Sequence, residues 1–594
     1  MPLVSKSFSD IITFSRGSNA TYFDSAGVLK YAPNNAIRNN TGVGAVAGTP
    51  GTLPTNWSTF TPLTGLTREI VGTGIENGIN YIDIRLSGTP SGAGLYLINF
   101  EANNQTSALN GQIWSGSSYF KLQSGTLAGV SSLVLRTSAL DAALAEVSTS
   151  SQSFTPTSSA LNTQRIIATL TNASASVLYE IVYLRLSLSG AAIDITLRIG
   201  LPQLEIGNTA GPAIPTSGTA YYGPRLDYNP STLAAQGLLI EEQRTNLATN
   251  SADFSSAFGV IGTSLTVTSD VTTSPDGGTN ADSVVESAAT EIHYAVKDFS
   301  ITGNATYSFS VFVKNFSGSR YVGLRVSNTT WTNRIAAVFD PRTGTWAIAP
   351  STAGSATGAT GAIQDVGNGW YKVTIIGLPD PAAATVRLTV ALSNTPTSSL
   401  PSYAGDGTSG VYIWGAQLEA GAFPTSYIPT TTIALTRAAD AASVNTLSPW
   451  FNASEGTIYS DFAGRVAGTQ PYISMLANTG ETERIYQRYV SGQYLSFVRI
   501  ANVDSLGVYN SSEGSAVNAK TATAYNSSQL AVSTNGQAVT GTAVASVSGV
   551  PSGLNKLWLG SFAGSSSFAN GYIRRITYYP VRLPNAQLQA LTAP

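Results

Sequence analysis

Few residues of this chain could carry out catalysis. The 594-residue sequence has no cysteine and a single histidine, His293, so thiolate zinc sites and a cysteine nucleophile are excluded. A serine-hydrolase triad would need His293, but this residue lies in an alternating strand pattern, and no Gly-x-Ser-x-Gly turn precedes a helix. Glu241 and Glu242 are the only adjacent carboxylates, and Arg244 beside them favours ion pairing over glycoside cleavage. We therefore predict that the protein is not an enzyme and has no catalytic residues.

Sugar binding is a stronger hypothesis, and Trp331 is its best candidate. Aromatic rings stack on the C–H faces of sugar rings, while amides and charged groups bind the hydroxyls. Trp331 stands in the small polar segment 327–334, with Asn333 and Arg334 beside it. We predict a carbohydrate-binding site at these three residues. A contact between subunits would explain the same exposed tryptophan, and that alternative stays open.

Calcium is the one cofactor for which the sequence offers ligands. Asp270, Asp276 and Asp282 lie near a turn, and calcium prefers such hard oxygen ligands. The EF-hand pattern is absent, however, and Pro-Asp-Gly at 275–277 makes a turn without any metal. We expect no other cofactor.

The composition excludes several classes of partner. Charged residues make up 11% of the chain, against about 25% in an ordinary soluble domain, and small polar residues take their place. The net charge of -2 offers no electrostatic footprint for nucleic acid. No run of about 18 apolar residues occurs, so we expect no membrane insertion. Residues 1–6 lack the pattern of a secretory signal, which would suit a surface protein of a virus particle released by lysis.

The elements that must position these residues are strands. Apolar and polar residues alternate with period two through most of the chain, and turn clusters recur about every 8–12 residues, as in a sandwich or jelly roll. Helical periodicity is limited to 138–147 and 584–591. The fold class is therefore all-β. The clearest strand patterns are 307–314, 457–462 and 571–579.

Two hairpins carry turn signals of their own. Segment 14–29 reads as a small hairpin with its turn at 25–27. Asn535-Gly536 is the stronger signal, because both residues accept a positive φ, and it predicts a hairpin between strands at 529–534 and 537–539.

An internal repeat divides the chain. The closures 201–207 (LPQLEIG) and 415–421 (GAQLEAG) match, and near the starts of the two copies 35–40 matches 246–251 at nearly the same offset. We predict two homologous jelly-roll sandwiches joined by a connector too apolar and aromatic to be flexible. The predicted segments are an N-terminal anchor at 1–32, a first jelly roll at 33–209, the connector at 210–245, a second jelly roll at 246–432, and a final sandwich at 433–594.

These landmarks carry a resemblance to a known class of proteins. The segments 14–29 and 237–246, the two Gln-Leu-Glu-x-Gly closures and Gly-Trp-Tyr-Lys-Val at 369–373 resemble bacteriophage fibre and appendage proteins built from carbohydrate-binding-module-like jelly rolls. Residues 450–594 look like a laminin-G or concanavalin-A-like lectin sandwich, with Asn535-Gly536, 557–560 and 571–579 matching its closing pattern. The first jelly roll departs from the pattern, because it has no Gly-Trp-Tyr motif.

The resemblance implies a structural protein of the virion surface. It implies a homotrimer that contacts other virion proteins through its N-terminal region and adheres to host cell-surface polysaccharide. No heptad coiled coil supports the trimer in the sequence itself. Two alternatives stay open: a capsid decoration or head fibre with a purely structural role, and a polysaccharide depolymerase.

Overall fold

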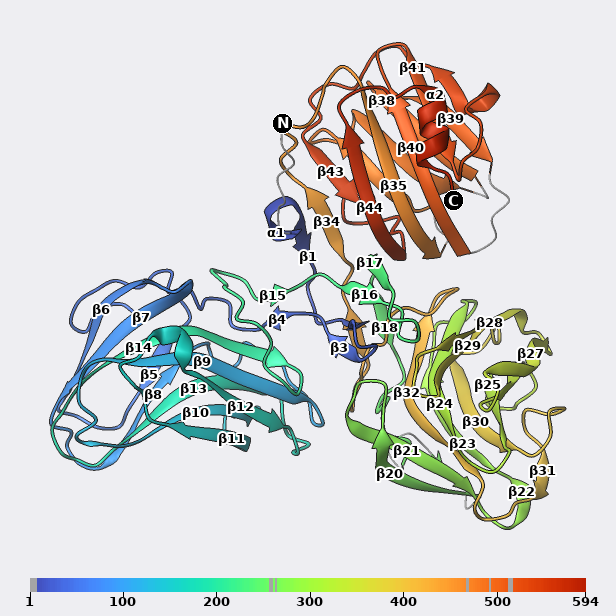
Figure 1. Cartoon of the computed structure of the whole chain (residues 1–594). Helices are drawn as coiled ribbons and strands as arrows, with labels where there is room; N and C mark the ends of the chain where they lie inside the picture. The colour runs from blue at the N-terminus through green and yellow to red at the C-terminus, as the bar shows by residue number, and fades with distance from the viewer. Residues whose placement is uncertain (1–7, 256–259, 262–263, 466–469, 491–492, 511–515) are drawn as a thin grey trace. The chain divides into compact units, whose positions relative to one another are not determined.

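Nearly every element of the chain is a strand. The computed structural model describes residues 8–255, 260–261, 264–465, 470–490, 493–510 and 516–594 (Figure 1). Residues 1–6, where we expect no secretory signal, lie outside these ranges. The strands form β-sandwiches, which confirms the all-β class with tandem jelly rolls and a concanavalin-A-like C-terminal sandwich. The chain divides into two compact units, residues 31–223 and residues 1–30 together with 224–594. No helix in the described ranges is long and apolar enough to cross a membrane.

The unit 31–223 is a sandwich of two five-stranded antiparallel sheets. One sheet contains, in spatial order, β11 (Glu146–Phe154), β10 (Val130–Leu140), β13 (Tyr179–Leu188), β8 (Gly94–Asn99) and β5 (Ser58–Phe60). The other contains β12 (Arg165–Thr171), β9 (Ile113–Gly125), β14 (Ile193–Ile206), β7 (Ile79–Gly88) and β6 (Leu66–Glu76). Alternate residues of both sheets, such as Leu135, Leu184 and Ile195, fill a common core. The unit begins and ends at one place, because β4 (Asn34–Asn35) pairs with β15 (Tyr221–Tyr222).

The helix predicted at 138–147 is wrong. Residues up to Leu140 belong to β10, and β11 begins at Glu146 after a tight turn. The Asp141 carboxylate accepts hydrogen bonds from the backbone N–H groups of Ala143 and Ala145, which fixes that turn. Ala139 faces the core while Leu140 packs on the other side of the sheet. Pairing with the neighbouring strands thus overrides the local helical pattern.

The second sandwich repeats the strand order of the first. One sheet runs β20 (Leu265–Thr273), β21 (Thr279–Glu286), β32 (Gly410–Ala420), β24 (Tyr307–Ser317), β29 (Trp370–Leu378) and β28 (Thr357–Asp365). The other runs β19 (Val260–Ile261), β23 (Tyr294–Ser300), β30 (Thr385–Ser393), β25 (Tyr321–Ser327), β26 (Arg334–Asp340) and β27 (Thr345–Ala353). Read in the same direction, these sheets match β6-β7-β14-β9-β12 and β5-β8-β13-β10-β11, with one added edge strand each. A short sheet of β22 (Thr290–Ile292) and β31 (Ser402–Ala404) lies beside them.

The matched sequence landmarks close both sandwiches with the same hydrogen bonds. In the first, Asn35 Oδ1 accepts from the N–H groups of Ile37 and Leu204 at 3.0 and 3.2 Å. In the second, Asn246 Oδ1 accepts from the N–H groups of Ala248 and Leu418 at 2.9 and 3.0 Å. The glutamine of each Gln-Leu-Glu closure likewise accepts from a backbone N–H eleven residues later: Gln203 from Ile214, and Gln417 from Ile428. The repeated residues thus provide hydrogen-bond acceptors for buried backbone N–H groups in both sandwiches.

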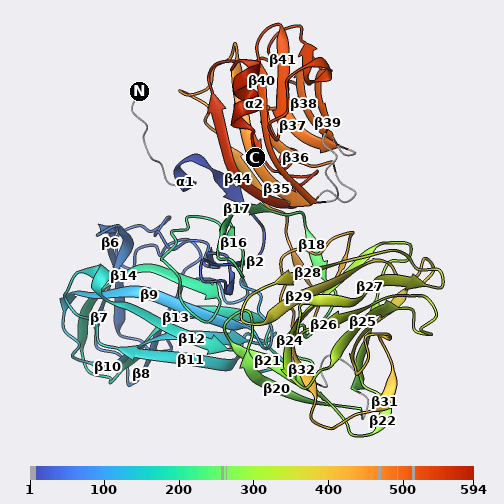
Figure 2. The ribbon, with the colours of Figure 1, turned by 45° about the vertical axis from the view of Figure 1, so that its right-hand side comes forward.

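The C-terminal sandwich has two seven-stranded sheets, seen as two layers in Figure 2. The first contains β1 (Thr13–Ser15), β34 (Ala441–Val444), β43 (Lys556–Leu559), β36 (Tyr472–Ala477), β37 (Arg484–Val490), β38 (Gln493–Ile500) and β39 (Val503–Asn510). The second contains β16 (Leu226–Tyr228), β17 (Ala235–Ile240), β44 (Gly571–Tyr579), β35 (Gly456–Arg465), β40 (Ala516–Tyr525), β41 (Gln529–Thr534) and β42 (Val544–Ser546). The N-terminal segment and the connector thus supply strands to this sandwich.

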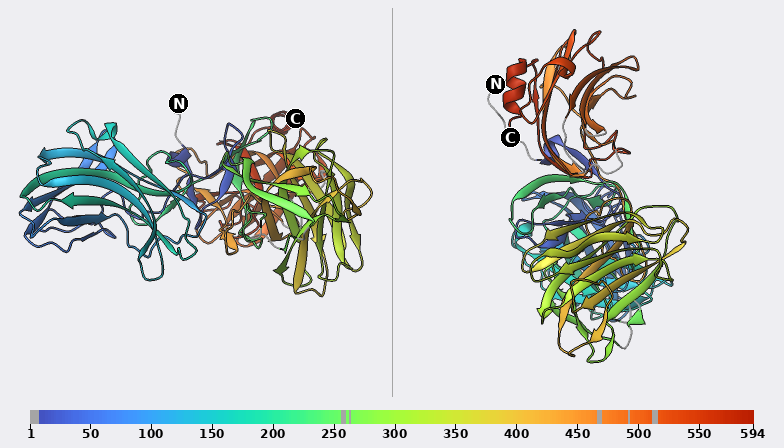
Figure 3. Two further views of the ribbon diagram at one scale, coloured as in Figure 1. Left: turned by 90° about the horizontal axis from the view of Figure 1, so that it is seen from below. Right: turned by 90° about the vertical axis from the view of Figure 1, so that its right-hand side faces the viewer.

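The short elements confirm some predictions and correct another. The hairpin β2 (Thr21–Phe23) and β3 (Leu29–Tyr31) turns at 25–27 as expected. Helix α2 (Asn585–Leu591) follows Pro584 as expected and lies on the outside of the C-terminal sandwich (Figure 3). Asn535-Gly536 does form a turn with positive φ at both residues, but 537–539 is not a strand. β41 pairs instead with β40 and β42, and the turn residue Gly536 donates its N–H to Thr592 Oγ1. The other short elements are α1 (Phe8–Ile11), β18 (Arg244–Asn246), β33 (Leu435–Arg437) and single 3₁₀ turns at Leu161–Thr163 and Gly541–Ala543.

Candidate functional site

The sheet β19-β23-β30-β25-β26-β27 of the second sandwich has one face in the core and one face turned outward (Figure 1, yellow-green). Along β25, Leu324 and Val326 pack in the core, so Arg325 and Ser327 point outward by strand alternation. On the neighbouring strands, Thr389 stands opposite Arg325, and Arg334 stands opposite Ser327. These four polar side chains therefore share the outer face of the sheet.

Trp331 lies at the edge of this face, in the turn between β25 and β26. Its backbone has φ +66°, which is unusual for a bulky side chain and costs roughly 1–3 kcal/mol. The half-buried ring meets the edge of Tyr294 at 6.1 Å, and the Arg387 guanidinium lies 5.2 Å from its centroid. Arg387 is itself held by Asp298, at 2.7 and 2.8 Å, and this pairing raises the pKa of Arg387. These contacts hold the Trp331 side chain in place.

Asn333 and Arg334 have different surroundings. The Asn333 side-chain amide donates to Asp380 Oδ2 at 2.7 Å, and its oxygen accepts from the Ser355 N–H at 3.0 Å. These bonds hold the turn that carries Trp331. Arg334 donates one hydrogen bond to the Trp331 carbonyl at 3.3 Å, and the rest of its guanidinium lies on the sheet face. The three residues predicted from sequence are therefore close together, with Asn333 in a supporting position.

A pocket of about 180 Å³ opens beside Arg334 on the same face. Arg325 and Arg334 line it, together with residues of β26 and β27 and the loop residues Thr397, Ser398 and Ser399. Gly323 lets that loop lie directly on the sheet, since a Cβ there would stand 2.0 Å from the Ser399 carbonyl oxygen. Arg325 donates to Ser399 Oγ at 2.8 Å. Burial, together with the charge of Arg334, lowers the pKa of Arg325 to about 10.

The sequence pattern does not mark Arg325 as a site residue. Its segment, YVGLRVS at 321–327, reads only as a strand with one charged residue. The available signal was the alternation, which places Arg325 and Ser327 on the face opposite the core. Neither the pairing of β25 with β26 nor the loop that closes the pocket is visible in that pattern.

The corresponding sheet of the first sandwich presents a different outer face. There Arg136 pairs with Glu146 at 2.7 Å, and the same carboxylate accepts from Ser138 and Tyr183. Tyr183 donates at 2.5 Å, and burial followed by the Glu146 contact raises its pKa. Arg185 is the other arginine of this face, and its ladder neighbours are Leu97 and Val134.

The aspartates of the predicted calcium loop do not gather around a common point. Asp282 accepts from the N–H groups of Phe254 and Asp270, at 2.6 and 3.0 Å, and burial raises its pKa to about 6. Asp276 closes its own turn by accepting from Ser274 and Gly278. Within the described ranges, no group of three or more acidic or histidine side chains could hold a metal ion. The carboxylates of Asp276 and Asp282 are instead used by turn and backbone contacts.

The single histidine is buried between two short strands. His293 lies between β22 and β23, so it is not within a strand as the sequence pattern suggested. Its ring nitrogens lie 2.9 Å from the Ser264 carbonyl oxygen and 3.3 Å from that of Tyr403. These contacts fix the imidazole within the fold.

A cluster of buried ion pairs joins the N-terminal segment, the connector and the start of the C-terminal sandwich. Arg225 is fully buried and pairs with Asp440 and, at 2.7 Å, with Glu241. Asp440 also pairs with Arg16 at 2.9 Å. Although burial opposes it, the charges of Arg437 and Arg225 hold the pKa of Glu241 below its usual range. Glu242 pairs with Arg244 at 2.5 Å, so ion pairing at the adjacent glutamates is confirmed.

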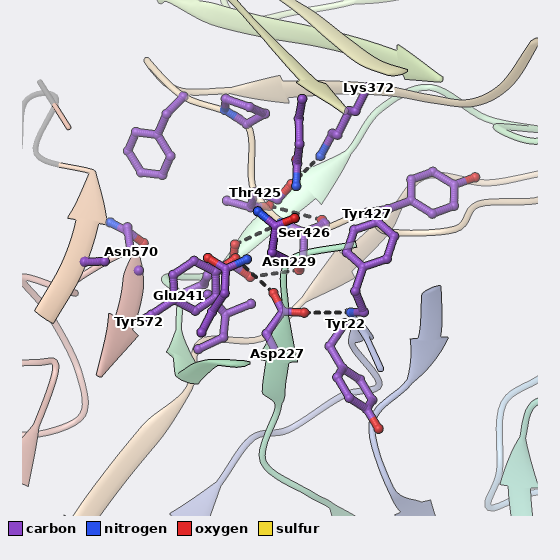
Figure 4. A pocket seen from close by; sticks show the side chains of 18 of the residues that line it. Tyr22, Asp227, Asn229, Glu241, Lys372, Thr425, Ser426, Tyr427, Asn570 and Tyr572 are labelled. Carbon is purple, nitrogen blue, oxygen red and sulfur yellow. Dashed lines mark hydrogen bonds between the residues drawn. The ribbon is translucent and has the colours of Figure 1, made fainter. Parts of the chain in front are cut away.

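Beside this cluster lies a second, polar pocket of about 410 Å³ (Figure 4). Asp227 occupies its centre, where it accepts from the Phe23 N–H at 2.7 Å and from the Tyr572 hydroxyl at 2.9 Å. Burial raises the pKa of Asp227 to about 6. Lys372, at the other side, donates to the Thr425 carbonyl at 2.9 Å. The polar groups of this pocket thus form hydrogen bonds within the protein, as expected where segments of one compact unit pack together.

Comparison with known proteins gives a likeness of fold only. No protein-family model and no curated protein matches the chain. The N-terminal CBM22-1–CBM22-2 tandem domain of Xyn10C from Paenibacillus barcinonensis is 14% identical, with a TM-score of 0.20, over 64% of this chain and 98% of its own. Domains LG4-5 of the mouse laminin alpha1 chain are 10% identical, with a TM-score of 0.18, over 49% of this chain and 88% of their own. These scores are too low to transfer the binding properties of either protein.

Proposed function

We propose that this protein is an adhesive surface protein that binds host cell-surface polysaccharide through the outer face of the second sandwich. The observation that carries this proposal is Trp331, a bulky residue held in a left-handed backbone conformation at the edge of a polar sheet face. A strained conformation survives where the surroundings impose it, and such residues concentrate at binding sites. Here the ring is fixed by Tyr294 and Arg387, so it would lose little freedom when a sugar stacks on it.

The wider setting that we propose is the surface of a bacteriophage particle, with the chain as a fibre or appendage subunit. This part rests on the resemblance of the segments at 14–29, 237–246 and 369–373 and of the two closures to such proteins. A homotrimer, joined to other virion proteins through the N-terminal region, belongs to the same proposal. Repetition of a weak sugar site in such a multimer would raise its overall avidity.

A glycan array comparing wild type with Trp331→Ala tests the adhesive function. We expect wild type to retain a subset of surface polysaccharides and the variant to bind them about tenfold more weakly, because the stacking ring is lost. Phe316→Ala is a matched control, since Phe316 is a 41% exposed aromatic residue on the other sheet of the same sandwich. Equal retention by wild type and Trp331→Ala would reject Trp331 as the platform. A blank array for wild type would reject the adhesive function.

A further inference from the structure

The pocket lined by Arg325 and Arg334 has two cationic side chains and no carboxylate among its described lining residues. Among the residues that the structure describes, neither Arg325 nor Arg334 forms an ion pair with a carboxylate. The acidic residues on this side of the sandwich are used elsewhere: Asp298 by Arg387, Asp340 by Arg342, and Asp380 by Asn328 and Asn333. Two neighbouring guanidinium groups repel each other, and burial of Arg325 increases the cost.

Two buried hydroxyl groups near the arginines also lack a hydrogen-bond partner among the described residues. The hydroxyl oxygens of Ser327 and Thr389 are buried and have no hydrogen-bond partner within the described part of the chain. Thr389 stands opposite Arg325, and Ser327 stands opposite Arg334, so both lie on the face that carries the pocket. Unpartnered buried hydroxyls are uncommon and call for an explanation.

The shape of the pocket limits what it can hold. Its volume of about 180 Å³ is below the roughly 300–1,000 Å³ of sites that enclose a drug-sized ligand. It would therefore take one substituent of a polymer, while the rest of the polymer stays outside the pocket. Arginine is suited to this role because its planar fork can bind two oxygens of a carboxylate or sulfate at once.

We infer that the Arg325–Arg334 pocket binds an anionic substituent, a carboxylate or a sulfate, of an acidic polysaccharide. This inference rests on the proposed function and adds the chemical class of its ligand. The bound anion would pair with the two arginines, which have no carboxylate partner in the described structure. The protein would then recognise both the acidic groups of the polysaccharide and its sugar rings. A neutral polymer of the same sugars would engage Trp331 alone.

Paired polymers test the inference and separate its two anion sources. Wild type is measured by biolayer interferometry on polygalacturonate against its methyl ester, and on dextran sulfate against dextran. We expect binding to one charged polymer and at least about tenfold weaker binding to its neutral partner, since a hydrogen bond to a charged group is worth about tenfold or more. The charged polymer that is retained identifies carboxylate or sulfate as the bound group.

Variants then assign the effect to the pocket. Arg325→Gln/Arg334→Gln should weaken binding to the charged polymer at least about tenfold. Arg334→Lys should fall between, because it keeps the charge but not the fork. Arg85→Gln removes an exposed arginine that pairs with Asp194 in the first sandwich, and should bind as wild type does. Unaltered binding by the double variant, or equal binding of charged and neutral polymers, overturns the inference.

Thermal unfolding in sodium sulfate or sodium galacturonate keeps the inference separate from the adhesive function. We expect either salt to stabilise wild type more than the double variant, with sodium chloride at equal ionic strength as the reference. Without added anion, the double variant should unfold at the same or a higher temperature than wild type, which also shows that it folds. Anion stabilisation with a blank glycan array would reject adhesion and keep the anion site. If wild type binds glycans but binding depends neither on their charge nor on the two arginines, the adhesive function is kept and the anion site is rejected.

Discussion

The two jelly-roll sandwiches share their strand order and their closing hydrogen bonds, but not their outer faces. Asn35 and Asn246 make matching bonds at the two closures. On the outward sheet of the first sandwich, Arg136 is neutralised by Glu146. On the matching sheet of the second, Arg325 and Arg334 share a pocket whose described lining residues include no carboxylate. The residues that satisfy buried backbone groups are thus retained in both copies, whereas the exposed face differs, as expected when function resides in a site and not in the fold.

The largest expected contrast between the two sandwiches is their response to alkali. The Glu180 carboxyl, inside the first sandwich, is buried with Asn172 as its only hydrogen-bond partner among the residues that the structure describes, and burial raises its pKa to about 8. Its folded-state pKa lies above the ordinary value of 4.5, so the folded state binds the extra proton and loses stability as pH rises through that interval. We expect a loss of about 4 kcal/mol between pH 5 and pH 8. For Asp282, in the second sandwich, the corresponding interval ends at about pH 6.

Calorimetry of the full chain at pH 5, 6.5 and 8 measures this contrast. Glu180→Gln should remove most of the decline above pH 6.5, since the amide stays neutral. Asp282→Asn, the matched variant in the second sandwich, should change the profile only below about pH 6. A decline above pH 6.5 that persists in Glu180→Gln would contradict the assignment to this carboxyl group.

Substitutions at the two closures should each cause a smaller loss of stability, and the two losses should be equal. Asn35→Ala and Asn246→Ala each leave buried backbone groups without a partner, and each should destabilise its sandwich by about 2–3 kcal/mol. Hydrogen exchange measured by mass spectrometry would show which strands open: β14 in the first variant and β32 in the second. If only one of the two variants is destabilised, the closures are not equivalent.

The smallest predicted effect converts the first outer face toward the second. Glu146→Gln leaves Arg136 without its carboxylate partner and should increase retention on the charged polymer by roughly twofold, because an exposed ion pair is worth little. Ser151→Gln, on the same strand β11 as Glu146, is the control for the added amide. If Glu146→Gln made the first sandwich bind the charged polymer as strongly as the second does, the residues around Arg325 and Arg334 would contribute nothing to affinity.

Much of the fold follows from local sequence patterns. Period-two alternation predicts β24, β35 and β44, because successive side chains of a strand point to opposite faces. The same local reasoning fails at 138–147, where helical spacing yields to strand pairing and to the turn at Asp141. The candidate site was predictable at Trp331, from an aromatic residue among small polar ones. It was not predictable at Arg325, because that site depends on which strands pair and on where the loop at 397–399 lies.

Strand β1 has a consequence for the order in which the chain matures. Its residues, Thr13–Ser15, pair with β34 at 441–443, and Arg16 pairs with Asp440. At synthesis rates of about 5–20 residues per second, the more than four hundred intervening residues take roughly 20–80 s to emerge. The whole of 31–223 is available to fold during that time, while β1 and Arg16 still wait for their partners. The stretch of sequence around β1 thus leaves the ribosome early and docks late.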